Sequence, residues 1–356
     1  MNRPLSEQSV LSEAINLFDF QRIAKEKMSA MAYEYVESGA ADEVTVRWNR
    51  EAFERIKLLP RVLADVSQLS TKVTLFGTEL AHPILVAPSA FHRLYHPEGE
   101  LATAKGAGMT SAGYVVSSYT TTPLEAIAEV ATAPLWFQLY VQDDRNFTKD
   151  LILRAIANGC KALCITVDTP TTGPRDRQIK AKFQLPADLV APYMVDTNLG
   201  NAARISTEHN PLTWNDITWI KTFTSIPVLL KGILHPADAE LAIQAGADGI
   251  VVSNHGGRNL DTVPATAEVM PRIADQVAGR IPLLMDGGIR RGTDVLKALA
   301  MGANAVLVGR PICFGLSAGG AEGVAKVLTI LRKELEMAMA LTGKTTLASI
   351  DQSVLH

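Results

Sequence analysis

The feature that most constrains the fold is a rhythm of short apolar runs, which begins at residue 84 and occurs eight times. The runs span residues 84–88, 114–118, 135–140, 163–168, 227–232, 250–254, 283–287 and 306–310. Segments of helical periodicity separate most of them, at 98–107, 146–157, 236–245 and 293–300. Runs that are apolar on both faces are typical of parallel strands beneath helices. Eight such units favour an α/β fold of the (β/α)8 type, the TIM barrel, over the alternative of a doubly wound open sheet.

Residues 1–83 precede this rhythm and are predicted to form a helical N-terminal extension, with helices at 19–37 and 46–55. No linker or second core separates the extension from the barrel at 84–356, so the sequence predicts a single domain over residues 1–356. The longest connection without periodicity follows the fourth strand, from about residue 169 to 213. Such a long connection is typically a lid or a binding loop, or else it is disordered.

Composition excludes several functional classes. The chain has 34 basic and 37 acidic residues and a net charge of −3, without the basic excess of a nucleic-acid-binding protein. Its three cysteines, Cys160, Cys164 and Cys313, are too few for a disulfide scaffold and have no histidine at zinc spacing. We therefore expect no metal site and a reducing compartment, the cytoplasm. Residues 106–124 carry no charge but include seven Ser or Thr, so we expect no contact with a membrane.

Most predicted strands end in a hydrogen-bonding or charged residue. The strand ends carry Pro88, Ser89, Ala90, Ser117, Gln138, Tyr140, Thr166, Asp168, Lys231, Ser253, His255, Asp286 and Arg310. In a barrel of this kind the carboxyl ends of all strands meet on one face, which is where active sites lie. The pattern therefore predicts a polar site on that face.

Two neighbouring strand ends are typical of a phosphate site. They carry Asp286, Gly287, Gly288, Ile289 and Arg290 after the seventh strand and Gly309 and Arg310 after the eighth. Glycines let backbone N–H groups approach an anion, and arginine supplies a forked donor. Tight turns with surface arginines are the alternative. No Gly-x-Gly-x-x-Gly motif follows the first strand, so a flavin mononucleotide (FMN) fits better than a nicotinamide dinucleotide.

His255 is the strongest candidate for a general base, because an imidazole titrates near neutral pH and Gly256, Gly257 and Arg258 follow it. A carboxylate from another strand end, such as Asp168, would orient the ring and stabilise its charged form. A structural role is the alternative for a single histidine in a loop.

Arg175 and Arg258 are candidates for binding a carboxylate through paired hydrogen bonds. Arg175 lies in a charge run with Asp176 and Arg177, so a surface position is an equal alternative for it.

Lys231 ends an apolar strand, where a buried ammonium needs an anionic partner. That partner is either a cofactor that becomes negative on reduction or a structural salt bridge. For Tyr35 and Tyr140 the spacing establishes no function, and core packing is the default interpretation.

With these residues in place, the chain resembles the FMN-dependent (S)-2-hydroxy acid oxidising enzymes, the family of glycolate oxidase, L-lactate oxidase, flavocytochrome lactate dehydrogenase and mandelate dehydrogenase. The matching strings are YEY at 33–35 before SGA at 38–40, APSA at 87–90, HPEGE at 96–100, WFQLY at 136–140, TVDTP at 166–170, KG at 231–232, SNHGGR at 253–258, DGGIRRGTD at 286–294 and GRP at 309–311. They follow the family's order from about residue 20 to the C-terminus. The SNHGGR string is highly specific, whereas other phosphate-binding barrels share the DGG string.

The resemblance implies a role for each matched residue. His255 is implied as the active-site base, paired with Asp168, and Tyr140 as a partner of the reacting hydroxyl group. Arg258, Arg175 and the Tyr35 hydroxyl are implied to bind the substrate carboxylate, while Lys231 stabilises the reduced flavin. The residues implied to bind FMN are Pro88, Ser89, Ala90, Ser117, Gln138, Tyr140, Thr166, Lys231, Ser253, Asp286, Gly287, Gly288, Ile289, Arg290, Gly309 and Arg310.

The implied reaction is oxidation of a 2-hydroxy acid to the 2-oxo acid, either by hydride transfer or through a carbanion. Tyr119 stands where glycolate oxidases typically have tryptophan and lactate oxidases can have tyrosine. Thr172, Gly173, Pro174 and Arg175 stand where relatives often have a bulky apolar residue, a glycine and paired arginines. We expect L-lactate as the first substrate and glycolate as the second.

Molecular oxygen is the expected electron acceptor, with hydrogen peroxide as product, because no cytochrome domain precedes the barrel. The loop after the fourth strand also lacks the long apolar insertion of membrane-bound mandelate dehydrogenases. A dehydrogenase with another acceptor is one alternative. Others are an FMN- or phosphate-binding barrel of different chemistry, such as an isomerase or a nucleotide dehydrogenase, and a barrel that has lost catalysis. By analogy with the relatives we expect a homo-oligomer, a tetramer or an octamer.

Overall fold

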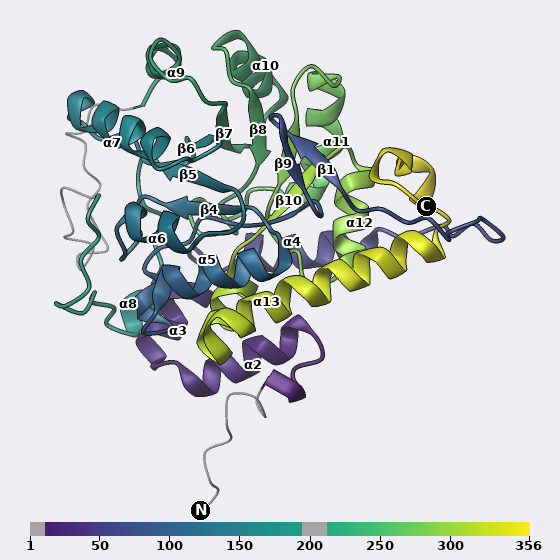
Figure 1. Ribbon diagram of the computed structural model, residues 1–356, viewed down its shortest axis with the longest axis horizontal. Helices are drawn as coiled ribbons and strands as arrows, with labels where there is room; N and C mark the ends of the chain where they lie inside the picture. Colours follow the sequence, from purple (N-terminus) through teal and green to yellow (C-terminus); the bar gives the residue numbers. More distant parts are fainter. Residues whose placement is uncertain (1–10, 194–211) are drawn as a thin grey trace, which may run out of the picture.

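The computed structural model describes residues 11–193 and 212–356 and contains a closed barrel of eight parallel strands (Figure 1). The strands are β3 (Ile84–Val86), β4 (Tyr114–Ser117), β5 (Leu135–Leu139), β6 (Leu163–Thr166), β7 (Val228–Ile233), β8 (Gly249–Val252), β9 (Leu283–Met285) and β10 (Ala305–Val308). Each strand pairs with its neighbours in chain order, and β10 pairs with β3 to close the barrel. The predicted (β/α)8 barrel is confirmed, and the strands differ from the predicted runs by one or two residues at their ends.

Side chains alternate between the inside of the barrel and the surrounding helices, as the two-residue period of a strand requires. A buried apolar cluster inside the barrel includes Leu85, Val115, Trp136, Cys164, Leu229, Val251, Leu284 and Leu307. The next position on the same face of each strand lies two residues further toward the carboxyl end. These positions are Ala87, Ser117, Gln138, Thr166, Lys231, Ser253, Asp286 and Gly309. The apolar interior therefore ends in a ring of mostly polar residues, all of which except Ala87 were predicted for the site.

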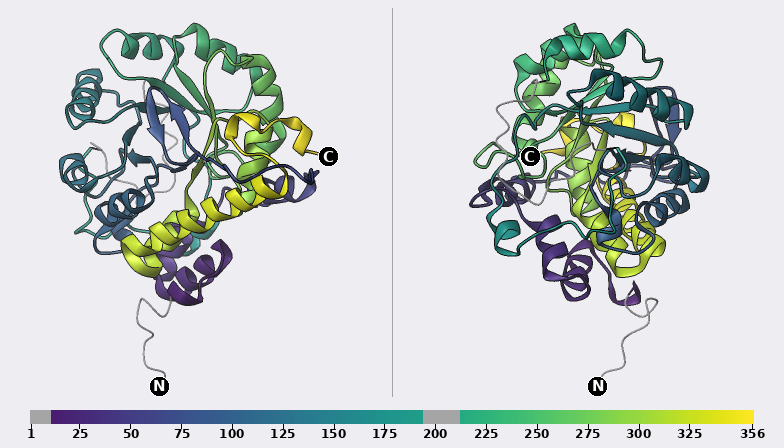
Figure 2. Two further views of the ribbon diagram at one scale, coloured as in Figure 1. Left: turned by 45° about the vertical axis from the view of Figure 1, so that its right-hand side comes forward. Right: turned by 90° about the vertical axis from the view of Figure 1, so that its left-hand side faces the viewer.

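A short antiparallel hairpin, which no periodicity predicted, packs against the amino ends of the barrel strands. It consists of β1 (Val73–Leu75) and β2 (Thr78–Leu80). Phe76 in its turn meets Trp136 edge-on, with ring centroids 5.5 Å apart. A Cβ on Gly249, the first residue of β8, would lie 2.8 Å from the Phe76 ring. The left view of Figure 2 shows the hairpin in front of the barrel strands, so the polar ring lies at the opposite end.

Helices surround the barrel (Figure 1). They are η1 (His92–Leu94), α5 (Gly99–Thr110), α6 (Leu124–Val130), α7 (Arg145–Ala157), α8 (Asp176–Lys180), α9 (Trp214–Lys221), α10 (Pro236–Gln244), α11 (Thr266–Val277), α12 (Gly292–Ala300), α13 (Arg310–Leu341), η2 (Leu347–Ser349) and η3 (Gln352–Val354). In the described part of the chain only α13 is long and apolar enough to cross a membrane, and 72% of its most apolar 18-residue stretch is buried inside the protein. It packs against α5 and bends where Gly319 and Gly320 leave the helical conformation.

The N-terminal extension contains α2 (Leu17–Lys27), α3 (Ala30–Glu37) and α4 (Val44–Arg55). The predicted helix at 19–37 is therefore divided in two. Met28 has an extended backbone, and the Ser29 hydroxyl accepts a hydrogen bond from the Ala32 N–H at 3.2 Å, which caps α3. Helix α2 packs against α13, so the extension is attached to the outside of the barrel.

The connection after β6, predicted to lack periodicity over 169–213, contains the short helix α8. Residues 194–211 of this prediction lie outside the described residues. The assignment of all 356 residues to one domain stays a prediction.

Candidate active site

The carboxyl ends of four neighbouring strands carry a row of polar side chains. Ser117 Oγ donates to Gln138 Oε1 at 3.0 Å, and Gln138 Nε2 donates to Thr166 Oγ1 at 2.9 Å. Thr166 lies opposite Lys231 in the register of β6 and β7. All four side chains are buried. The barrel thus brings together four of the residues predicted to bind FMN.

Lys231 forms a buried ion pair in this row. Its Nζ lies 3.6 Å from Asp286 Oδ2, and the two side chains are 5% and 10% exposed. Burial acts to lower the pKa of Lys231, but the carboxylates of Asp286 and Asp168 outweigh it and raise the pKa. Asp286 Oδ1, also buried, has no hydrogen-bond partner among residues 11–193 and 212–356. Lys231 is therefore a permanent cation, and Asp286 keeps an acceptor for a further donor.

The segment after β9 offers donors that suit a phosphate group. Gly288 approaches α4 so closely that a Cβ there would lie 2.1 Å from the Asn49 carbonyl oxygen. Arg290 donates to the Ile289 carbonyl at 2.9 Å, and within the described segments it forms no ion pair with a carboxylate. Burial and the charge of Arg310 lower the pKa of Arg290 to about 10, which leaves the guanidinium charged at neutral pH. A buried cation without a carboxylate partner in the described residues fits the phosphate of FMN.

Arg310 is placed differently from Arg290. Its guanidinium donates to the carbonyl oxygens of Val36, Ser38 and Gly256 at 3.1, 3.2 and 2.8 Å. These partners occupy the side chain, so any contribution of Arg310 to a phosphate comes from its backbone N–H in the first turn of α13.

His255 and Asp168 form a hydrogen-bonded pair across two strand ends. His255 Nδ1 lies 3.0 Å from Asp168 Oδ1 and 3.3 Å from Oδ2. Gly232 on β7 leaves room for the Asp168 side chain, because a Cβ at this position would lie 2.4 Å from Asp168 Cβ. The backbone N–H of His255 donates to Ser253 Oγ at 3.1 Å. The His255 backbone is left-handed, with φ +56°. The other ring nitrogen, Nε2, lies 3.5 Å from Tyr140 Oη.

The charges around His255 favour its neutral form. Burial and the charge of Lys231 lower the pKa of His255, against the opposite effect of Asp168. Burial would raise the pKa of Asp168, but His255 and Lys231 hold that pKa at about 2. Burial raises the pKa of Tyr140 to about 12, so its hydroxyl keeps its proton. A neutral imidazole whose Nδ1 is oriented by a carboxylate is suited to act as a general base through Nε2.

Arg258 and Arg175 lie on the loops after β8 and β6. Arg258 donates to the Ser38 carbonyl at 2.7 Å and places its guanidinium 5.4 Å from the centre of the Tyr35 ring. Arg175 donates from Nε to the Arg258 carbonyl at 3.3 Å. Burial and the charge of Arg258 lower the pKa of Arg175 to about 10, and Arg175 in turn lowers the pKa of His255. Arg175 therefore belongs to the site and not to the solvated surface, and the two like charges favour binding of an anion.

Five aromatic side chains form a continuous wall beside these groups. The ring centroids are 5.2 Å apart for Tyr140 and Tyr119, 5.7 Å for Tyr119 and Phe91, 5.6 Å for Phe91 and Tyr35, and 4.4 Å for Tyr35 and Phe183. Tyr35, Tyr140 and Tyr119 are thus brought together as predicted. Phe91 was missed although it directly follows the APSA string, whereas Phe183 lies in the loop after α8 and has no sequence signal.

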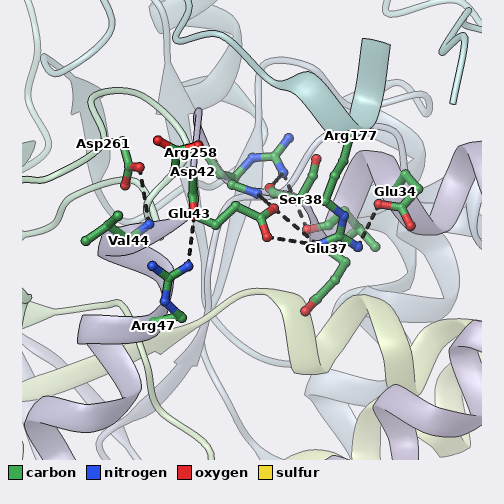
Figure 3. Close-up of polar contacts among 12 residues, drawn as sticks. Glu34, Glu37, Ser38, Asp42, Glu43, Val44, Arg47, Arg177, Arg258 and Asp261 are labelled. Atoms are coloured by element: carbon green, nitrogen blue, oxygen red, sulfur yellow. Dashed lines mark hydrogen bonds and ion pairs between the residues drawn. The ribbon is translucent and has the colours of Figure 1, made fainter. Parts of the chain in front are cut away.

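The extension completes the site from outside the barrel through Tyr35, whose role the resemblance implied, and through contacts of α4, which the sequence did not reveal. Asn49 on α4 and Asn254 after β8 exchange two buried amide hydrogen bonds, of 3.0 and 2.8 Å. Figure 3 shows the segment between α3 and α4 against both arginine-bearing loops, with the Val44 N–H donating to Asp261 at 3.2 Å. Asn254 lies inside the SNHGGR string, but the string alone does not indicate its partner.

The remaining predicted residues lie on the same face. Pro88, Ser89 and Ala90 follow β3 and are half-buried. Across the described ranges no group of three His, Cys, Asp or Glu side chains is arranged to hold a metal ion. The face thus combines an imidazole paired with a carboxylate, two arginines without carboxylate partners in the described residues and a row of buried hydrogen-bonding side chains.

Comparisons with known proteins match nearly the whole chain. A family model described as FMN-dependent dehydrogenase matches residues 24–356. A 2-hydroxyacid oxidase of Dictyostelium discoideum is 48% identical over 352 residues, covering 97% of this chain and 91% of that protein. An L-lactate oxidase of Nostoc sp. is 45% identical over 368 residues, covering 98% of this chain and all of that protein. Glycolate oxidase 3 of Oryza sativa subsp. indica is 43% identical over 348 residues, covering 95% of each chain.

Solved structures give the same result for the fold. The crystal structure of mandelate oxidase with (S)-2-phenylpropionate superimposes with a TM-score of 0.89 at 39% sequence identity. The match covers 96% of this chain and 98% of that chain.

Proposed function

This chain belongs to the FMN-dependent dehydrogenase family, and from that premise we propose that it oxidises a small (S)-2-hydroxy acid to the 2-oxo acid, with O2 as electron acceptor. The reaction balances as 2-hydroxy acid plus O2 giving 2-oxo acid plus H2O2. The protein is an FMN-dependent oxidoreductase of the 2-hydroxy acid oxidase family. The observation that carries the proposal is the grouping of His255, Asp168 and Tyr140 beside two arginines that lack carboxylate partners in the described residues.

The arginines bind and orient the substrate. A 2-hydroxy acid carries a carboxylate next to the carbon that is oxidised, and the forked donors of Arg258 and Arg175 match such a group. Tyr35, whose pKa is raised by burial, keeps its hydroxyl proton for the same carboxylate. Binding the carboxylate in this way places the substrate hydroxyl near His255 and Tyr140.

His255 removes a proton from the substrate. Its Nε2 lies 3.5 Å from Tyr140 Oη, and its lowered pKa makes the imidazole neutral before the reaction. The charged Asp168, hydrogen-bonded to Nδ1, then stabilises the imidazolium that forms. The Tyr140 hydroxyl donates a hydrogen bond to the reacting oxygen. FMN, when bound, supplies the redox chemistry by accepting two electrons from the substrate and passing them to the acceptor.

The cofactor is held by the ring of strand ends. Ser117, Gln138, Thr166 and Lys231 are buried donors or acceptors that suit the polar edge of a flavin. Lys231, kept charged by its two carboxylate neighbours, would stabilise negative charge that develops on the bound cofactor. Arg290 would hold the phosphate.

L-lactate is our first choice of substrate and glycolate the second. Tyr119, a tyrosine where glycolate oxidases typically have tryptophan, lies in the aromatic wall in contact with Tyr140 and Phe91. A relative named L-lactate oxidase is 45% identical, and one named glycolate oxidase 43% identical, which supports both choices.

An anaerobic absorbance spectrum tests the function directly. The purified protein is mixed with L-lactate, glycolate or mandelate, and air is admitted afterwards. We expect L-lactate to bleach the flavin band fastest and air to restore it. Bleaching without recovery in air would indicate a dehydrogenase with another acceptor. A flavin band that no hydroxy acid bleaches would refute the proposed function.

We also propose that the enzyme works in the cytoplasm as a homotetramer or octamer. Val62 and Leu63 support an assembly, because they are adjacent apolar residues that are 84% and 102% exposed. The three cysteines are free and buried, which suits a reducing compartment. Light scattering during size-exclusion chromatography measures the assembly, and a monomer would contradict this part of the proposal.

A further inference from the structure

Arg177, two residues after Arg175, joins the loop after β6 to the N-terminal extension (Figure 3). Its guanidinium lies 2.7 Å from Glu34 Oε2 on α3 and 3.1 Å from both carboxylate oxygens of Glu43, which precedes α4. The Arg177 side chain is 39% exposed and the two glutamates 26% and 23%, so both ion pairs are partly shielded from water. The charge run at 175–177 therefore contains arginines with different partners.

Glu43 is fixed independently of Arg177. Its Oε1 accepts the Gly39 N–H at 2.7 Å, and its backbone is left-handed, with φ +59°. The next two N–H groups, of Val44 and Thr45, donate to the Asp261 carboxylate at 3.2 and 2.8 Å. A partner that is already ordered loses little conformational entropy when the ion pair forms, so this ion pair is stronger than one between two free surface side chains.

The segment 38–45 also contacts both loops that carry the site arginines. The Ala41 N–H donates to the Pro174 carbonyl, and the Ala40 N–H donates to the Gly257 carbonyl, each at 2.8 Å. Residues next to both site arginines are thus hydrogen-bonded to a single short stretch of the extension. The relative position of the two loops depends on this stretch.

Arg175 needs such support because its own contacts are few. Its guanidinium donates to the Arg258 carbonyl at 3.3 Å and, in the described parts of the chain, has no carboxylate partner. The charge of Arg258 repels it. Arg175 is the residue that precedes α8, and Arg177 lies in the first turn of that helix. The ion pairs of Arg177 therefore act on the same turn that carries Arg175.

We propose that Arg177 is a positioning residue that holds Arg175 at the substrate-carboxylate site through its ion pairs with Glu34 and Glu43. The proposal rests on the proposed function, since it requires Arg175 to bind a carboxylate. Loss of the ion pairs lowers the fraction of molecules in which Arg175 is in place, and the apparent affinity falls by that fraction. For two partly exposed ion pairs we expect about a fivefold loss of affinity.

The test compares Arg177→Gln with Arg47→Gln in the FMN-loaded protein. Arg47 is a matched control because it donates to the Asp42 carbonyl at 2.8 Å, a bond that stays within the extension. Oxalate, a carboxylate probe without an α-hydrogen, is titrated through its effect on flavin absorbance. Amide hydrogen exchange is measured over residues 174–183. We expect Arg177→Gln to raise the oxalate Kd about fivefold and to speed exchange, Arg47→Gln to change neither, and Arg177→Lys to restore part of both.

Each other outcome counts against the proposal. An unchanged oxalate Kd in Arg177→Gln refutes the positioning role, even where exchange becomes faster, because the ion pairs would then be merely structural. A wild-type protein that neither binds oxalate nor is bleached by any 2-hydroxy acid refutes the proposed function, and the role of Arg177 with it. Equally tight oxalate binding by wild type and Arg177→Gln refutes the role of Arg177 and leaves the proposed function standing.

Discussion

His255 is held by three separate contacts, to Ser253, Asp168 and Tyr140, and none of them is a main support of the barrel. The ring can therefore be removed with little effect on the residues that are proposed to hold FMN. His255→Ala is expected to keep its yellow colour while the rate of flavin reduction by L-lactate falls by about 10²- to 10⁴-fold, the usual contribution of a general base. Anaerobic stopped-flow absorbance measures that rate. Near-normal reduction would remove His255 from the role of base.

The pH dependence of reduction follows from the same residues. The pKa of His255 is lowered by burial and by Lys231, so the ring is neutral at pH 7 and becomes protonated only below its ordinary range. We expect a constant rate of flavin reduction around neutral pH and a fall as the pH drops through this lowered pKa. A fall that begins well above pH 7 would contradict the assignment.

Asp168→Asn tests the electrostatic part of the dyad. Asp168 raises the pKa of His255, so its removal lowers that pKa further and moves the acid limb of the rate profile to lower pH. The rate on the plateau also falls, because the neutral amide stabilises the imidazolium less than a carboxylate does. The profile of wild type, measured with the same substrate, is the reference. A limb that moves to higher pH would be inconsistent with this geometry.

Site residues that follow a strand could be predicted from the sequence. Residues whose position depends on a partner distant in the chain could not. His255 and Asp168 each follow a strand, so barrel geometry alone brings them to one face. Arg175 remained ambiguous because a charge run is the same in sequence whether it faces solvent or a pocket. Its neighbour Arg177 pairs with Glu34 and Glu43 on the extension, and Glu43 lies 134 positions away in the chain. No local pattern encodes such a pairing.

At the scale of elements, Glu100 in the first turn of α5 joins the loops after β3 and β4. Its carboxylate accepts the N–H groups of His92 and Thr121, at 3.0 and 2.8 Å, and the hydroxyl groups of Thr121 and Thr122. Glu100 is fully buried. The two loops it joins are those that carry Phe91 and Tyr119 of the aromatic wall.

Glu100→Gln is expected to lower the free energy of unfolding by about 1–3 kcal/mol, because an amide leaves buried donors without an acceptor. It should also raise KM for L-lactate as the wall loosens. Glu98→Gln is a matched control two residues away, since Glu98 is 54% exposed and pairs only with Lys105 among the described residues. Urea unfolding of the FMN-loaded proteins measures the difference. Equal stability of the two variants would show that the buried carboxylate does not hold the loops.

The eight strands could be predicted because each is buried on both faces and so carries a mostly apolar run. Elements fixed by tertiary contact could not. The β1–β2 hairpin is stabilised by Phe76 against Trp136, residues far apart in the chain, and its strands have only three residues each. Helix α8 is similarly short, and its arginine is anchored on the extension. The break at Ser29 was readable in principle, because serine is a preferred N-cap residue.

At the scale of the whole molecule, the extension and the barrel share one site. Asn49 and Arg50 on α4 contact Asn254 and Asp294, which follow β8 and β9, and the Arg50–Asp294 ion pair measures 2.7 Å. Arg290 lies beside these contacts, and its pKa is lowered by burial and by Arg310. Arg310 therefore repels Arg290 at the proposed phosphate position, and a bound anion would relieve that repulsion.

We expect FMN removal to destabilise the protein and FMN addition to restore it, by about 2.7 kcal/mol at a ligand concentration 100 times the Kd. Riboflavin, which lacks the phosphate, should stabilise much less. Arg290→Gln should weaken FMN binding and reduce its advantage over riboflavin. Arg291→Gln is the matched control, because Arg291 is paired with Glu334 at 2.8 Å and points to a different partner. Thermal unfolding of the stripped proteins with each ligand provides the comparison. Equal stabilisation by FMN and riboflavin would mean that the phosphate binds elsewhere, and equal effects of the two substitutions would exclude Arg290 as its specific partner.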